Sequence, residues 1–363
     1  MAASAHDTVP VWTYIVPLAA GLALGLKFAG ILPGNSPAVL ALAAALLGAS
    51  VFAAVHHAEV LAVRVGEPFG SILLAVSVTV IEVALIVSIL LSETPGSAAV
   101  ARDTVFAAVM IVLNGVVGLC LVMGGRRHHE QTFQVDGAAA TLAVLGTLAT
   151  FALVMPNFTN ATRGPSYAPI QLIVVGAVSL ALYAVFVFVQ TIRHRDYFLD
   201  SVDDAPVHAV PSNAVTASSA VLLLVSLTAV VLLAKVLSKP LDVALQQAGL
   251  PVTFMGVVIA AIVLLPEGVA ALKAALSNRL QNSINLALGS AVAIIGLTIP
   301  TVAAVSLVFD IPLTLGLSDE NMVLLLLTLF AGTLTLGTGR TTVLQGAVHL
   351  VIFAVFLLLS AVP

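Results

Sequence analysis

The hydrophobic pattern of the chain consists of long apolar runs separated by short polar or turn-forming clusters. The runs are rich in Leu, Val and Ala, and they lack the turn-separated alternation that is typical of a β-barrel. About 20 apolar residues in a row are enough for a helix to cross a bilayer. The pattern therefore predicts eleven transmembrane helices, at 11–32, 37–62, 68–91, 103–123, 137–156, 169–192, 213–237, 252–276, 283–309, 321–337 and 342–361.

A long polar segment near the middle of the chain, RHRDYFLDSVDDAPVHAVPS, divides this pattern into two halves. We take 1–34 as an extra N-terminal helix, 35–193 as the first repeat, 194–212 as an acidic and His-containing linker, and 213–363 as the second repeat. Each repeat has five helices, and an odd number means that the second repeat is inserted upside down relative to the first. The expected fold is an all-α polytopic membrane protein with one extra N-terminal helix and two inverted five-helix repeats.

The composition supports the same class. Of the 363 residues, 60% are hydrophobic and 8% are charged, which is too apolar for a soluble domain of this size. The lipid bilayer is thus the expected partner, and the net charge of −4 gives no reason to expect nucleic acid. The single cysteine, Cys120, excludes a disulfide framework. The N-terminus has no basic segment typical of a cleaved signal peptide, so the first apolar run should remain as a helix.

Lysine and arginine are enriched in cytoplasmic loops, and their distribution predicts the orientation. Counted on the eleven helices with a cytoplasmic N-terminus, the inside loops carry Arg64, Arg126, Arg127, Arg193, Arg195, Lys273, Arg279 and Arg340, and the outside loops carry Lys27, Arg102, Arg163, Lys235 and Lys239. This bias places the N-terminus and the acidic linker in the cytoplasm and the C-terminus outside.

Two glutamates, Glu82 and Glu267, lie deep inside apolar runs, each in the second helix of its predicted repeat. A carboxylate at that depth costs at least a few kcal/mol, so such residues usually handle ions or protons. A pair of carboxyl groups has low net charge when both are protonated or when both surround a divalent cation. Hard oxygen ligands suit Ca²⁺, and Na⁺ or K⁺ can use the same oxygens. The alternative is a protonated pair that only packs the helices.

Other polar groups lie close to these acids in the predicted arrangement. Asn114 and Ser290 occur beside glycines in the helices that follow the two acids, where they can complete a coordination shell or bond helices together. Pro266 precedes Glu267 and would free the carbonyl of Ile262, either as a ligand or as part of an ordinary kink.

The histidines within apolar runs form a separate set of candidates. His56, His57 and Glu59 do not match the HExxH motif of zinc proteases. They are either interfacial residues or, for His57 and Glu59, part of a proton relay. His349 has no acidic neighbour in its run, and we expect it to be a buried histidine with its hydrogen bonds satisfied.

The stretches HHAEVLAVRVGEPFGSILLAVSVTVIEVALI, PEGVAALKAALSNRLQNSINLALGSAVAIIGLTIP and GTGRTTVLQGAVHL resemble the cation/Ca²⁺ exchanger superfamily, and in it the ChaA-type calcium (sodium, potassium)/proton antiporters of bacteria. The resemblance implies a bacterial inner-membrane location, inverted repeats, and that Glu82 and Glu267 match the acids of the two signature repeats. The wider calcium/proton exchanger pattern has Gly-Asn before each acid, whereas Ile81 and Pro266 directly precede the acids here.

We therefore expect a secondary active antiporter that exchanges a cation, with Ca²⁺ first and Na⁺ or K⁺ as alternatives, for protons by alternating access. Its partners are inorganic cations and protons, and no cofactor is expected. An intramembrane protease would need a nucleophile with a base or a pair of aspartates, and the Gly-x-Ser-x-Gly motif is absent. An organic-solute carrier or a channel is a further alternative. The residues leave the oligomeric state open.

Overall fold

The structure of the chain is a computed structural model that describes residues 10–31, 36–66, 69–90, 97–199, 210–251 and 253–362. Within these residues, eleven helical segments are long and apolar enough to cross a membrane. This confirms the predicted all-α polytopic class, and most segment boundaries agree with the prediction to within a few residues. Residues 200–209 of the predicted linker lie outside the described residues.

Seven segments are single α-helices. They are α1 (Val11–Phe28), α2 (Pro37–Val65), α3 (Phe69–Leu90), α8 (Asn213–Gln247), α9 (Phe254–Leu276), α12 (Asp319–Leu336) and α13 (Val343–Ala361). The prediction for α8 was wrong at its C-terminal end, because the helix continues past residue 237 and through Pro240. A proline removes one backbone hydrogen bond and bends a helix without always ending it.

The other four segments are helices interrupted by a π-helical turn or a similar irregularity. They are α4 (Val100–Met110) with η2 (Ile111–Val116) and α5 (Val117–His128); α6 (Val135–Ala149) with η3 (Thr150–Val154) and η4 (Met155–Phe158); α7 (Pro169–Phe188) with η5 (Val189–Arg193); and α10 (Leu280–Ala293) with η7 (Ile294–Thr298) and α11 (Ile299–Phe309). Such π turns are rare and are often found at functional sites. Asn114 lies in one of them, η2.

The helices form two compact units, one of Met1–Ser88 with Val202–Ala244 and one of Ile89–Ser201 with Leu245–Pro363. The compact units group helices by contact, whereas the predicted repeats are units of symmetry. The repeat boundaries therefore stay a prediction.

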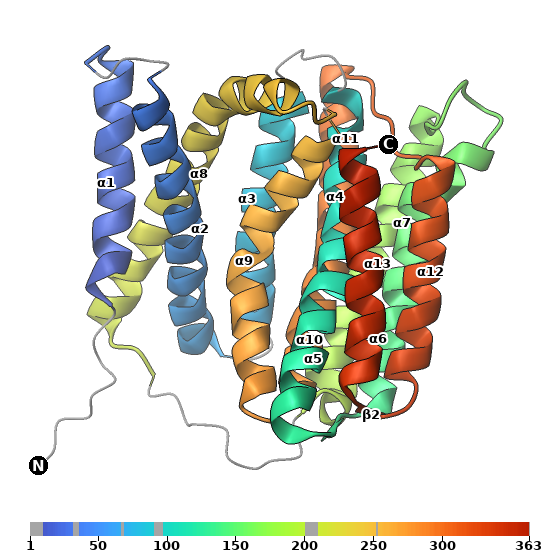
Figure 1. Cartoon of the computed structure of the whole chain (residues 1–363). Coiled ribbons are helices and arrows are strands. Elements are labelled where there is room, and N and C mark those ends of the chain that lie inside the picture. The colour runs from blue at the N-terminus through green and yellow to red at the C-terminus, as the bar shows by residue number, and fades with distance from the viewer. Residues whose placement is uncertain are drawn as a thin grey trace, which may run out of the picture. The chain divides into compact units, whose positions relative to one another are not determined.

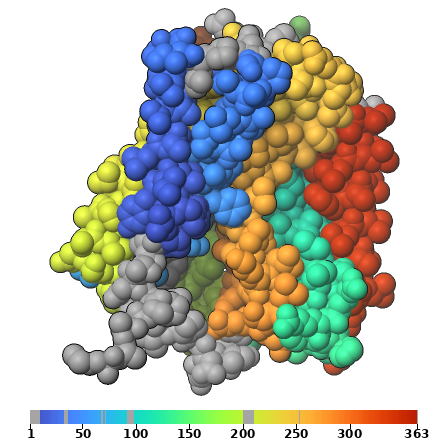
Figure 2. All heavy atoms as spheres, turned by 60° about the vertical axis from the view of Figure 1, so that its left-hand side comes forward, coloured from blue at the N-terminus to red at the C-terminus, as the bar shows by residue number. Residues whose placement is uncertain are grey.

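In the first unit, the extra N-terminal helix α1 packs along α2 (Figure 2). His57 of α2 is fully buried, with its Nε2 3.0 Å from the carbonyl oxygen of Thr13 in α1 and its Nδ1 3.3 Å from Oγ of Ser219 in α8. At the end of α2, Arg64 donates to the carbonyl of Pro211 and to Oδ1 of Asn213, at the start of α8. These hydrogen bonds join α1, α2 and α8.

In the second unit, α13 packs against both α5 and α12, while α9 packs against α4, α5 and α10 (Figure 1). A short antiparallel pair of strands, β1 (Gln131–Thr132) and β2 (Arg340–Thr341), joins the ends of α5 and α12 with Gln131 opposite Thr341.

Glycines permit the closest helix contacts in this unit. A Cβ on Gly346 of α13 would come within 2.7 Å of the carbonyl oxygen of Gly118 and the amide nitrogen of Val122 in α5. A Cβ on Gly256 of α9 would come within 2.7 Å of the Asp103 carbonyl carbon. Small residues at helix interfaces allow backbones to approach, which favours association inside a bilayer.

We predict that Gly346→Ala lowers the thermal stability of the detergent-purified protein, because the added methyl group overlaps backbone atoms that cannot rotate away. Overpacking of this kind costs about 1–3 kcal/mol. The matched control is Gly146→Ala in α6, whose Cβ would meet only Leu329 methyl groups at 3.8 Å. A melting temperature for Gly346→Ala equal to that of the control would contradict the close contact.

Candidate functional site

Glu267 lies in the middle of α9 and is half-buried. The helix continues without a break through Pro266, which is itself buried. Glu267 is therefore flanked by α-helix both before and after it in the sequence. The structure thus places the second predicted acid within a membrane-spanning segment of the second compact unit.

Contacts between α4–η2 and α9 place Asn114 at the level of Glu267. Gly256 approaches Asp103. Further along the two segments, Gly268 approaches Val116, and a Cβ added to the glycine would lie 3.3 Å from the valine Cγ2. Both residue numbers increase together, so the two segments run parallel. Asn114 comes two residues before Val116 and Glu267 one before Gly268, which at about 1.5 Å of rise per residue puts them at nearly the same level.

Ser290 reaches this level from a third helix. The turn Ser277 to Arg279 joins α9 to α10, and the two helices pack against each other. Glu267 lies nine residues before Leu276, the last residue of α9, and Ser290 lies ten residues after Leu280, the first of α10. The described residues therefore bring Glu267, Asn114 and Ser290 to one level in the second unit.

Gln131 in β1 fixes the turn between α9 and α10. Its Nε2 donates to the carbonyl oxygen of Ala275, at 2.9 Å, and to Oδ1 of Asn278, at 3.0 Å. Asn278 has a φ of 58°, in the left-handed region that asparagine tolerates better than most residues. The alignment of Glu267 with Ser290 thus depends on a turn that a side chain from another part of the unit holds.

The side chain of Asn114 is fully buried and bridges three helical segments. Its Nδ2 donates to Oγ1 of Thr328 in α12, at 2.8 Å, and its Oδ1 is 3.0 Å from Nδ1 of His349 in α13. Nε2 of His349 is 3.1 Å from Oγ1 of Thr335. The expectation of a satisfied buried His349 is confirmed, while its pairing with Asn114 was not foreseen.

Glu82 lies in α3 and belongs to the other compact unit. It is 1% exposed, and Ser77 and Thr79 of the same helix are also buried. Burial of a carboxyl group in the middle of a membrane-spanning helix is costly and marks a functional candidate. Its role as a partner of Glu267 stays a prediction.

His57 and Glu59 are separated by their positions on α2. His57 is buried against Thr13 and Ser219, whereas the Glu59 side chain is 52% exposed and lies 4.0 Å from His56 Nδ1. The structure therefore gives His57 a role in joining helices, and a proton relay through the two residues stays a prediction.

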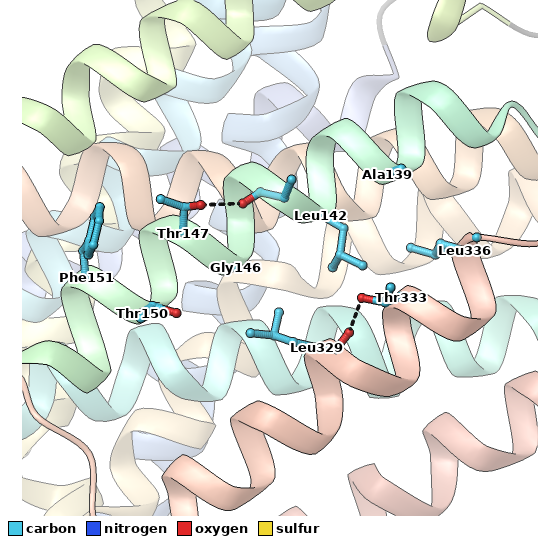
Figure 3. A pocket seen from close by; sticks show the side chains of 11 residues that line it. Ala139, Leu142, Gly146, Thr147, Thr150, Phe151, Leu329, Thr333 and Leu336 are labelled. Atoms are coloured by element: carbon cyan, nitrogen blue, oxygen red, sulfur yellow. Dashed lines mark hydrogen bonds between the residues drawn. The ribbon is translucent and has the colours of Figure 1, made fainter.

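A cavity of about 620 Å³ lies between α6 and α12 (Figure 3). Its lining has no ionisable side chain, and the hydroxyls of Thr147 and Thr333 donate to the carbonyls of Ala143 and Leu329 in their own helices. A cavity with these walls offers few ligands to a cation. The residues at the level of Glu267 are therefore the better candidate for a cation site.

The sequence model of the Sodium/calcium exchanger protein family matches residues 35–192 and 218–362, which is most of the chain. The chain belongs to this family. It is therefore a membrane cation exchanger and not an enzyme, and cation antiport is the activity that family and fold support.

Individual relatives agree with this assignment. The chain is 60% identical over 363 residues to the "Putative ionic transporter y4hA" of Sinorhizobium fredii, covering 99% of this chain and 98% of the relative. It is 37% identical over 321 residues to the sodium-potassium/proton antiporter ChaA of Escherichia coli, covering 86% and 87%. The fold is similar to that of the Ca²⁺/H⁺ antiporter protein YfkE, with a TM-score of 0.72, 17% identity, and coverage of 97% and 99%.

We predict that Gly268→Val weakens cation exchange, because a branched side chain at this position would push α9 away from Val116 and displace Glu267. Gly268→Ala should retain most activity, since the single methyl group meets only the end of a side chain that can shift. Initial rates of cation uptake into everted vesicles measure both variants. Equal rates in Gly268→Val and the wild type would show that this contact does not position the site.

Proposed function

We propose that the protein is a secondary active antiporter of the bacterial inner membrane that exchanges a cation, Ca²⁺ first, for protons by alternating access. Glu82 and Glu267 bind the cation when ionised and carry protons when neutral. Asn114 and Ser290 are supporting ligands. Inward proton flow drives extrusion of the cation.

The observation that carries this proposal is the alignment of Glu267, Asn114 and Ser290 on three helices packed in one unit. Carboxylate, amide and hydroxyl oxygens at one level are the hard ligands that Ca²⁺ takes, in sets of six to eight. Backbone carbonyls and water would complete such a set. Glu82 adds a second carboxyl group, which is 1% exposed and lies near the middle of its own helix.

The charge balance explains the coupling to protons. Two ionised glutamates neutralise one divalent cation, and two protonated glutamates are neutral without it. A charged, empty pair is disfavoured in an apolar environment. The transporter would thus return with about two protons for each divalent ion carried.

Two features support an inverted repeat as the basis of alternating access. The family model matches two segments, whose limits lie close to the proposed repeats. Corresponding helices of the two segments, α4–α5 and α10–α11, each contain a π-helical turn, and each turn contacts the other helix pair. We also propose a cytoplasmic N-terminus and an outside C-terminus, because lysine and arginine are more frequent in the loops predicted to face the cytoplasm.

A second candidate is Na⁺/H⁺ or K⁺/H⁺ exchange at the same site. The specific observation in its favour is the 37% identity to the sodium-potassium/proton antiporter ChaA. Uptake of Ca²⁺, Na⁺ and K⁺ by proteoliposomes, each measured with an imposed proton gradient, decides between the ions.

We expect Glu82→Gln and Glu267→Gln each to abolish exchange while leaving a folded protein in the membrane. Glutamine has nearly the shape of glutamate but cannot alternate between charged and protonated forms. Counterflow of cations and protons in proteoliposomes is the measurement, with gel filtration in detergent to check folding.

Glu130→Gln is the matched control, because its side chain is 49% exposed and pairs with Arg340 at the surface. It should exchange ions at close to the wild-type rate. A normal rate in Glu82→Gln or Glu267→Gln would rule out the two-carboxylate mechanism.

Protons and the cation compete for the same oxygens, so we predict that cation affinity rises with pH. If both glutamates release protons on binding a divalent ion, affinity should climb by up to about a hundredfold per pH unit while both groups are mainly protonated, and then level off. The test uses a variant with Asp196, Asp200, Asp203 and Asp204 changed to Asn, since the acidic linker could also bind cations. Affinity independent of pH between about 5 and 9 would separate the proton site from the cation site.

A further inference from the structure

A chain of hydrogen bonds runs through the second unit between residues that are far apart in the sequence. It joins Thr335 of α12, His349 of α13, Asn114 of η2 and Thr328 of α12, and it ends at Met110, whose sulfur is 3.3 Å from the Thr328 hydroxyl. All five residues are at most 4% exposed. Buried polar networks that are fully satisfied hold a single arrangement of the surrounding side chains.

The direction of each bond follows from the groups present. The Asn114 amide oxygen can only accept, so His349 donates from Nδ1 and, when neutral, accepts at Nε2 from the Thr335 hydroxyl. Asn114 then donates from Nδ2 to Thr328, whose hydroxyl donates to the sulfur of Met110. An amide accepts and donates on different atoms, so it does not pass protons along. These hydrogen bonds therefore position side chains and do not conduct protons.

The packing of α13 on α5 brings His349 close enough for this contact. A Cβ on Gly118 would lie 3.0 Å from the His349 Cβ, and Gly346 one turn earlier approaches the α5 backbone. Gly118 follows Asn114 by four residues, and His349 follows Gly346 by three. The two glycines thus place the imidazole ring against the π turn that carries Asn114.

We propose that His349 is a positioning residue for the cation site, acting through the Asn114 amide. This inference rests on the proposed function, in which Asn114 supports the ion bound by Glu267. An asparagine amide has two orientations of nearly equal shape, and only its hydrogen bonds choose between them. The Nδ1–H group of His349 selects the orientation with Oδ1 on its side and leaves a second lone pair of that oxygen for a cation.

Without this donor, the amide can rotate and present its N–H groups to the cation, which is an unfavourable contact. Loss of the His349 donor should therefore lower the affinity for the ion. A hydrogen bond of this kind is worth about 0.5–1.5 kcal/mol, which corresponds to a rise of about 2- to 12-fold in the apparent KM. The maximal rate should change by less than about twofold.

Two substitutions separate the two sides of the imidazole ring. In His349→Asn, the side-chain amide takes the place of Nδ1 and can still donate to Asn114. In His349→Gln, the amide takes the place of Nε2 and reaches Thr335 instead. We expect His349→Gln to show the raised KM and His349→Asn to stay within about twofold of the wild type.

Thr335→Val serves as a control, because it removes the other partner of His349 and leaves the Asn114 contact in place. It should keep the wild-type KM. Thr328→Val removes the acceptor of the Asn114 amide and should raise the KM as His349→Gln does. It provides a second test if His349→Gln does not fold, as judged by gel filtration.

Uptake kinetics in proteoliposomes and cation-induced thermal stabilisation of the purified protein are measured together, with Ca²⁺, Na⁺ and K⁺ each used as the probe. A raised KM in His349→Gln and Thr328→Val, with a normal KM in His349→Asn and Thr335→Val, supports the inference. Reduced stability of His349→Gln with an unchanged KM overturns it and leaves His349 a structural residue. If Glu267→Gln still exchanges ions, the proposed function fails instead.

Discussion

Lipid offers no hydrogen-bond partner, so a polar side chain that is buried away from water inside a bilayer has to find its partner within the protein. The second unit meets this constraint with side chains that bridge separate helices. Asn114 contacts Thr328 and His349, and Gln131 holds the turn between α9 and α10. The Asn114 bridges hold η2 against α12 and α13, and the Gln131 hydrogen bonds fix the turn between the helices that carry Glu267 and Ser290. The same constraint makes a glutamate in the middle of a membrane-spanning helix costly, and this cost is the reason for proposing that Glu82 and Glu267 bind an ion or a proton.

Close helix contacts make those bridges possible. Hydrogen bonds reach only about 3 Å, so α13 has to approach α5 nearly to backbone contact before His349 can reach the π turn. Gly118 and Gly346 allow this approach, and Gly256 does the same for α9 against α4. The π turn η2 then directs Asn114 toward α12 and α13. Packing by small residues and polar bridging thus depend on each other.

Local sequence was sufficient to predict the membrane class, the eleven helical segments and the two glutamates within them, since the length of an apolar run and an acidic residue inside it are local signals. It could not predict that α8 continues through Pro240, because neighbouring contacts decide whether a proline ends a helix. The pairing of Asn114 with His349, 235 residues later, was also missed. Gly118 and Gly346, which lie four and three residues from these polar side chains, indicate that each helix can be approached closely. No local pattern specifies that the two helices approach each other. The ligand roles of Glu82, Glu267, Asn114 and Ser290 stay predictions.

The central claim is that one cation displaces protons from two glutamates, and counting those protons tests it most directly. Purified protein in weakly buffered detergent solution is titrated with Ca²⁺ while a pH indicator reports the protons released per ion bound. At a pH where both glutamates are protonated, we predict about two protons per Ca²⁺ in the wild type and about one in Glu82→Gln, if that variant still binds the ion. Binding of Ca²⁺ by the wild type without proton release would contradict the account.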